Sequence, residues 1–131
     1  MDFQLTDEQK ELKQSVRRYA REKLAPIAAE IEETGEPPSR ELLKEFAAMG
    51  YLGVNIPKDL GGQGYDNLEA LIVLQELAEI SSAVAFPVFE SSVGPIRAIE
   101  KYGQKELVEE IVPAVCEGRK VVAVAMSEPN A

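Results

Sequence analysis

The segment from Leu68 to Ile80, LEALIVLQELAEI, limits the fold of this chain more than any other stretch, because a helix of this sequence is apolar on nearly every side. Asp66 or Asn67 can cap its N-terminus. A helix that is apolar all round is stable in water only when other elements cover several of its faces. The sequence therefore predicts a central helix with neighbours on several sides. The apolar residues that spread around it are Leu68, Leu71, Ile72, Val73, Leu74 and Leu77.

The segments before this helix have the pattern of amphipathic helices. Thr6-Asp7-Glu8-Gln9 has the form of a capping box, and apolar residues then recur every three or four positions from Leu12 to Ile31. Pro26 lies within this stripe, so we expect it to break or kink the stripe into two consecutive helices. After a Gly-Glu-Pro-Pro connector, Ser39 can cap a further helix.

Two more helical stripes follow the central segment. Apolar residues at helical spacing run from Phe86 to Ile99 and again from Leu107 to Val115, and a glycine follows each stripe. In total the chain has five or six predicted helices joined by short loops. This pattern predicts an all-α fold, an up-and-down helical bundle formed by residues 1–120.

The loop between the third predicted helix and the central one, YLGVNIPKDLGGQGYD, contains four glycines and one proline. Its Gly61-Gly62-Gln63-Gly64 stretch could be interpreted as a cradle for a phosphate. However, it lacks the preceding strand and the Lys-Ser/Thr pair of a P-loop. We therefore interpret it as an ordered set of turns.

The C-terminal stretch KVVAVAMSEPNA has the pattern of a strand that runs into a loop. Val121 to Met126 is an unbroken apolar run rich in valine, and Ser127-Glu128-Pro129-Asn130 has the composition of a turn. No earlier segment resembles a partner strand, and an unpaired strand leaves its backbone groups without hydrogen bonds. Either the partner strand of this segment is missing, or the segment is not a strand.

Composition argues against several classes of function. With 45% hydrophobic and 28% charged residues, the 131-residue chain resembles one soluble globular domain. A net charge of −9 argues against nucleic acid as a partner, since the phosphates would be repelled. Cys116 is the only cysteine and there is no histidine, which argues against an intrachain disulfide and against a zinc or copper site.

The N-terminal segment, MDFQLTDEQKELKQ, is acidic and polar, unlike a signal or transit peptide. No apolar stretch reaches the ~20 uncharged residues that a membrane-spanning helix needs. We therefore expect a cytoplasmic protein with no membrane span.

Three stretches together resemble the acyl-CoA dehydrogenase family. They are LTDEQKELKQSVRRYAREKLAPIAAEIEETGEPP, MGYLGVNIPKDLGGQGYDNLEALIVLQELAE and AVAMSEPNA, in the order that the family shows. Members have an N-terminal helical domain, a middle β domain and a C-terminal helical bundle. The resemblance implies that residues 1–120 form the first domain and that residues 121–131 begin a truncated middle β domain, which would explain a strand without a partner.

The resemblance implies the α,β-dehydrogenation of acyl-CoA thioesters, in which a carboxylate removes the α-proton and the β-hydrogen passes as hydride to FAD. In the family that carboxylate lies in the C-terminal domain. We therefore expect no catalytic residue in this chain, no activity from the chain alone and no FAD bound to it. The implied partners are acyl-CoA and an electron-transfer flavoprotein, and the parent protein is expected to be a homo-oligomer.

The resemblance also implies cofactor-binding residues. By position, Val124, Met126 and Ser127 would contact the flavin, and the Ser127 hydroxyl could donate or accept a hydrogen bond. The alternative is that Ser127 only caps a turn.

The acyl chain would lie against the helix that carries Ala85, Phe86, Phe89 and Val93. The two phenylalanines would form a wall that shortens the cavity or shapes it for a ring or a branched acyl group. The alternative is that both are ordinary core residues.

Two other classes of function stay open at this point. Acyl-CoA oxidases, nitroalkane oxidases and flavin-dependent N-hydroxylases share this helical domain, and assays of electron acceptors would separate them. The second alternative is a helical binding module that stands alone, for which no β domain or C-terminal bundle would follow in the gene.

Overall fold

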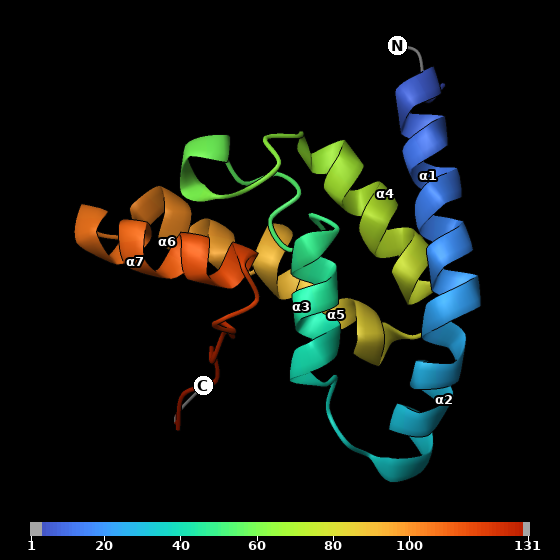
Figure 1. The fold of residues 1–131 in the computed structure, drawn as a ribbon. Helices are drawn as coiled ribbons and strands as arrows, with labels where there is room; N and C mark the ends of the chain where they lie inside the picture. The colour runs from blue at the N-terminus through green and yellow to red at the C-terminus, as the bar shows by residue number, and fades with distance from the viewer. Residues whose placement is uncertain (1–3, 130–131) are drawn as a thin grey trace.

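The computed structural model describes residues 4–129, and these residues form an all-α fold, as the sequence predicts (Figure 1). A π-helix, η1 (Ala20–Leu24), joins α1 to α2, and a 3-10 helix, η2 (Lys58–Leu60), lies in the loop before α4. Because α1, η1 and α2 form one continuous helix, the seven α-helices of the described residues make up six separate helical segments. The α-helices are α1 (Asp7–Tyr19), α2 (Ala25–Thr34), α3 (Arg40–Ala48), α4 (Asn67–Ala78), α5 (Ser82–Ser92), α6 (Ile96–Tyr102) and α7 (Lys105–Cys116).

Pro26 does not break the first helix, although the sequence predicts a break or a kink there. The backbone stays helical from Asp7 to Thr34, and the π-helix η1 ends at the residue before α2. Pro26 is the second residue of α2 and has no backbone N–H, so the continuous helix lacks one backbone hydrogen bond at this position. The predicted irregularity is therefore a π-turn, which accommodates the proline without ending the helix.

Helix α4 lies between α1 and α5, as predicted for a helix that is apolar on most sides (Figure 1). Its Ala70, Val73 and Leu77 are buried in the main core. Leu68 and Leu71 are 47% and 50% exposed, so one face of α4 remains open. The main core also contains, from the other helices, Val16, Ala20, Leu24, Ala28, Leu42, Phe46, Val84, Ala85 and Val88.

A second, smaller core joins the loop before α4 to α6 and α7, which lie side by side (Figure 1). Its buried members are Ile56, Ile96, Val112, Val115 and Cys116. This core fixes the direction in which the chain leaves α7 and enters the C-terminal tail.

The glycine-rich loop is a set of turns, as predicted, and it does not form a phosphate cradle. The backbone N–H groups of residues 61 to 64 donate, in order, to the carbonyls of Lys58, Pro57, Gly53 and Ile56. All four donors are used within the loop, so none is free to hold an anion.

The apolar run from Val121 to Met126 is strand-like in its sequence but forms no β-strand within the described residues. It leaves α7 as an irregular tail (Figure 1) because no other segment of the described chain pairs with it. Val122 packs against the smaller core, whereas Val124 and Met126 are 61% and 79% exposed. Asn130, which ends the predicted turn, and Ala131 lie outside the described residues.

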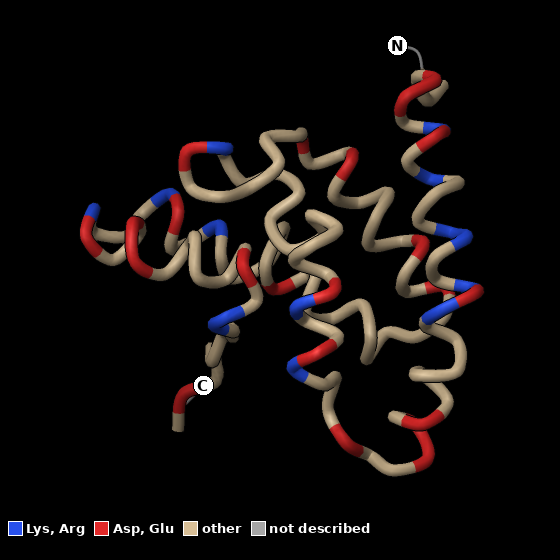
Figure 2. The backbone as a smooth tube through the Cα atoms, in the orientation of Figure 1, with Lys and Arg blue, Asp and Glu red and all other residues tan. Residues whose placement is uncertain are grey.

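The helices found in residues 4–129 are each too short or too polar to cross a membrane. Within the same residues, no group of three or more Asp, Glu, Cys or His side chains is arranged to hold a metal ion. Figure 2 shows that acidic residues are spread along the helical backbone.

Candidate functional site

Helix α5 carries the four residues that the sequence analysis predicts for an acyl pocket. Ser81 accepts a hydrogen bond from the N–H of Val84 and so caps the start of the helix. Val84 and Val88 bury one face of α5 in the main core, which determines the face that stays open. Phe86 lies on that open face and is 55% exposed, unusual for a large aromatic side chain.

An apolar groove, here called the α4–α5 groove, runs between these two helices. Its volume is about 290 Å³. The ring centroids of Phe86 and Phe89 are 5.5 Å apart, with an angle of 44° between the ring planes, so the two rings form one aromatic wall. The residues that line the groove are Leu74 and Ala78 of α4 and Ser82, Ala85, Phe86 and Phe89 of α5.

The structure brings three of the four predicted acyl-pocket residues together. Ala85, Phe86 and Phe89 line the α4–α5 groove, whereas Val93 does not line it and packs against the main core. Phe86 is half exposed and Phe89 is partly buried, so neither is a fully buried core residue. Their role toward a ligand stays a prediction.

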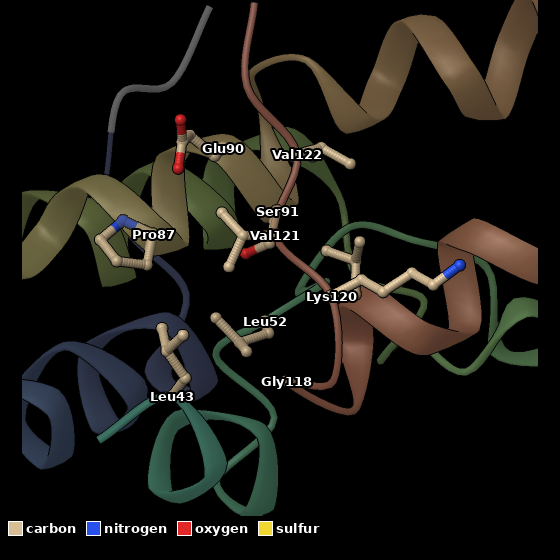
Figure 3. A pocket seen from close by; sticks show the side chains of 10 residues that line it. Leu43, Leu52, Pro87, Glu90, Ser91, Gly118, Lys120, Val121 and Val122 are labelled. Atoms are coloured by element: carbon tan, nitrogen blue, oxygen red, sulfur yellow. The ribbon is translucent and has the colours of Figure 1, made fainter. Parts of the chain in front are cut away.

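A second apolar cavity, here called the tail cavity, lies on the other side of Phe86, between α3, α5 and the C-terminal tail. Its volume is about 390 Å³, and its walls include Leu43, Pro87, Glu90 and Val121. A much smaller cavity of about 10 Å³ shares these four residues (Figure 3). Phe86 is thus the wall that the α4–α5 groove and the tail cavity have in common.

Glu90 is a residue of this region that the sequence analysis missed. It is the one charged residue of α5. Burial raises the pKa of its carboxyl above the ordinary value of 4.5, and this carboxyl has no hydrogen bond or ion pair with any described residue. A single glutamate within the apolar run SAVAFPVFESSV was the sequence signal that could have pointed to it.

The predicted flavin contacts lie on the C-terminal tail. Val124, Met126 and Ser127 are all exposed, and the Ser127 hydroxyl makes no hydrogen bond with another described residue. Two apolar side chains and a free hydroxyl suit a planar ring with a polar edge. An exposed tail encloses nothing, however, so these residues could form only one side of a flavin site.

The match to known proteins extends over nearly the whole chain. The family model of the acyl-CoA dehydrogenase N-terminal domain matches residues 6–119. The chain belongs to the acyl-CoA dehydrogenase family. A glutaryl-CoA dehydrogenase from Mycobacterium smegmatis that shares its fold, with a TM-score of 0.79 at 23% identity over 89% of this chain and 30% of that one, was solved in complex with FADH2.

Two relatives and one solved structure show how much of a longer protein the chain covers. Acryloyl-CoA reductase (NADH) of Anaerotignum propionicum is 39% identical over 131 residues, which are 100% of this chain and 33% of that protein. Mitochondrial isovaleryl-CoA dehydrogenase of Bos taurus is 37% identical over 128 residues, 97% of this chain and 30% of that protein.

Butyryl-CoA dehydrogenase from Megasphaera elsdenii superimposes with a TM-score of 0.86 at 29% identity, over 100% of this chain and 35% of that one. The chain therefore spans about a third of the length of these three proteins.

Proposed function

We propose that this chain is the N-terminal domain of an FAD-dependent acyl-CoA dehydrogenase, in which it lines the acyl-chain pocket and forms one side of the flavin site. The observation that carries the proposal is the open apolar face of α5, where Phe86 and Phe89 form an aromatic wall beside a groove. A domain that left this face bare in the active protein would expose a large apolar patch to water.

The acyl chain would be held by apolar contact with α5. Ala85 leaves room beside the helix backbone, and the paired rings of Phe86 and Phe89 limit how far a chain can extend along it. We infer that the pocket takes short, branched or ring-bearing acyl groups rather than long linear ones. Binding energy from this contact would place the reacting carbons of the thioester correctly.

The flavin would lie against the tail. Val124 and Met126 would contact the ring system and the Ser127 hydroxyl would hydrogen-bond to its polar edge. FAD, when bound, supplies the acceptor for the hydride that leaves the β-carbon. No residue of this chain is proposed as the base that takes the α-proton, and we place that carboxylate in the polypeptide beyond this domain.

The partners of the full-length protein are proposals of the same kind. We propose that it binds acyl-CoA, passes electrons to an electron-transfer flavoprotein and assembles as a homo-oligomer. The net charge of −9 supports steering toward a partner with a basic docking surface. A cytoplasmic location is likewise a prediction, and it rests on the acidic and polar N-terminal segment.

Substitution of the aromatic wall in the full-length protein tests the acyl-pocket role. Phe86→Ala should raise the ratio of kcat/KM for octanoyl-CoA to that for butyryl-CoA by about tenfold, because the shortened side chain opens the pocket. Tyr102→Ala is the matched control, since Tyr102 is an aromatic residue on α6 with 86% exposure. An unchanged ratio in Phe86→Ala, or the same change in both variants, would contradict the proposal.

A further inference from the structure

The tail cavity contains one carboxylate among apolar walls. Glu90 follows Phe86 by four residues on α5, so the two side chains lie on the same side of the helix. Besides Glu90, the cavity is lined by Pro37, Pro38, Leu43, Ala83, Phe86, Pro87 and Val121. Figure 3, which draws the small cavity next to the tail cavity, shows the Glu90 carboxylate on the opposite side of that cavity from Leu43 and Leu52.

No cation of residues 4–129 forms an ion pair with this carboxylate. Among the described residues that line the tail cavity or the small cavity next to it, Lys120 is the only basic one. The Lys120 ammonium is instead bound to Glu110, with 2.7 Å between Nζ and Oε1. The Glu90 carboxylate therefore lies at the edge of the cavity without a partner among the described residues, in surroundings that screen its charge less than bulk water does.

We propose that Glu90 determines acyl specificity by excluding acyl groups that carry a second negative charge, such as a terminal carboxylate. This inference rests on the proposed function and adds one placement to it: the acyl chain lies against Phe86, and its end passes this ring from the α4–α5 groove into the tail cavity. A second anion in the cavity would lie close to an unpaired carboxylate, and neither charge would have a cation to offset the repulsion. A neutral acyl group of the same length meets only apolar walls there.

The position of Glu90 explains how one side chain can have this effect. It lies next to Phe89 in the chain and shares the tail cavity with Phe86, the residue that also borders the α4–α5 groove. An acyl chain in contact with Phe86 on the side of the tail would therefore end near the Glu90 carboxylate. Because Glu90 is held on a helix, its charge would repel a second anion only at one position along the acyl chain.

Pentanoyl-CoA and glutaryl-CoA test the proposal, because both acyl groups have five carbons and only glutaryl carries a second carboxylate. Binding of each to the full-length protein is measured by isothermal titration calorimetry. We expect the wild type to prefer pentanoyl-CoA, and Glu90→Gln to lower that preference by about tenfold. Glu90→Arg should lower it further, since a cation would attract the terminal carboxylate.

Glu106→Gln is the matched control, because Glu106 is an exposed carboxylate on α7 and its substitution removes the same charge. It should leave the preference within about twofold of the wild type. If Glu90→Gln and Glu90→Arg both keep the wild-type preference while pentanoyl-CoA still binds, the role of Glu90 is refuted and the proposed function stands. If the wild type binds neither ligand, the proposed function fails, and this inference fails with it.

Discussion

Arg17 on α1 holds Glu76 of α4 by two hydrogen bonds, from Nε to Oε2 at 2.7 Å and from Nη2 to Oε1 at 3.0 Å. Glu76 is only 1% exposed, so its charge is buried between the two helices. Lys13 adds a second cation, with its Nζ 3.6 Å from Oε1. This cluster fixes how the central helix is positioned against α1, and α4 in turn carries one side of the α4–α5 groove.

Loss of the guanidinium should destabilise the fold. We expect Arg17→Met to lower the free energy of unfolding by about 2 to 3 kcal/mol, because a buried carboxylate then keeps only Lys13 as a partner. Arg18→Met is the control, since Arg18 is exposed, and it should cost less than about 0.5 kcal/mol. Urea denaturation of this chain measures both, and equal losses in the two variants would refute the role of the pair.

The same pair predicts how stability depends on pH. The hydrogen bond from Arg17 lowers the pKa of Glu76 below its ordinary value of 4.5 in the folded state. Its contribution to stability is therefore complete above the unfolded pKa and is lost as the pH falls through the lower folded pKa. Glu69 adds to the effect in the same direction, because the hydrogen bond from Gln9 lowers its pKa.

We expect the free energy of unfolding to fall between about pH 5 and about pH 3, and to fall less steeply in Glu76→Gln. Denaturation curves at several pH values, with Glu106→Gln as a control for the loss of one charge, provide the comparison. A slope in Glu76→Gln equal to that of the control would show that Glu76 does not contribute.

Local elements of the fold could be predicted because their causes are local. The capping box at Thr6 forms as predicted, with Thr6 N–H donating to Gln9 Oε1 at 3.0 Å and Gln9 N–H donating to Thr6 Oγ1 at 3.2 Å. Gln9 also donates to Glu69 Oε1 at 2.7 Å, and Glu69 Oε2 accepts from the N–H of Asp66. The hydrogen bond from Gln9 to Glu69 joins the starts of α1 and α4. It depends on how these two helices pack, which the local sequence does not determine.

Some residues of the candidate site could likewise be predicted from the sequence, and others could not. The resemblance to the family predicts that Ala85, Phe86 and Phe89 share one pocket wall, and in the structure all three line the α4–α5 groove. Val93 continues their helical spacing, but the helix ends there and its side chain packs on the core. A glutamate on a helix is typical of a solvated face, and only the packing of α3 and the tail against α5 makes the surroundings of Glu90 apolar.

The turn interpretation of the glycine-rich loop makes a prediction about Gly62. A Cβ there would clash with the carbonyl oxygen of Ile56 and would lie 2.5 Å from the Ile56 Cβ. We expect Gly62→Ala to lower the free energy of unfolding by about 3 kcal/mol, because the backbone of Ile56 cannot move aside as a flexible side chain can.

Gly35→Ala is the comparison for this loop. Gly35 has a φ of 70°, and a Cβ added to it would meet no atom within 4 Å. Gly35→Ala should therefore lower the free energy of unfolding by about 1 kcal/mol, from backbone strain alone. Thermal unfolding of both variants would decide, and a Gly62→Ala variant as stable as Gly35→Ala would contradict the close packing.

The exposed tail predicts how the chain behaves without the rest of the protein. Val124, Met126 and Ser127 offer one side of a flavin site and enclose nothing. We therefore expect the purified 131-residue chain to be colourless and to bind no FAD, and the full-length protein to be yellow. Absorbance after gel filtration with added FAD is the measurement, and stoichiometric flavin on the isolated chain would overturn the prediction.

The most direct test of the proposed function is the flavin absorbance of the full-length protein when short acyl-CoA thioesters are added without oxygen. We predict that the absorbance of oxidised flavin disappears with butyryl-CoA or isovaleryl-CoA, and that 2,3-unsaturated acyl-CoA forms in equal amount. An absorbance that stays unchanged with every acyl-CoA, in a protein that holds its full complement of FAD, would contradict the proposed function.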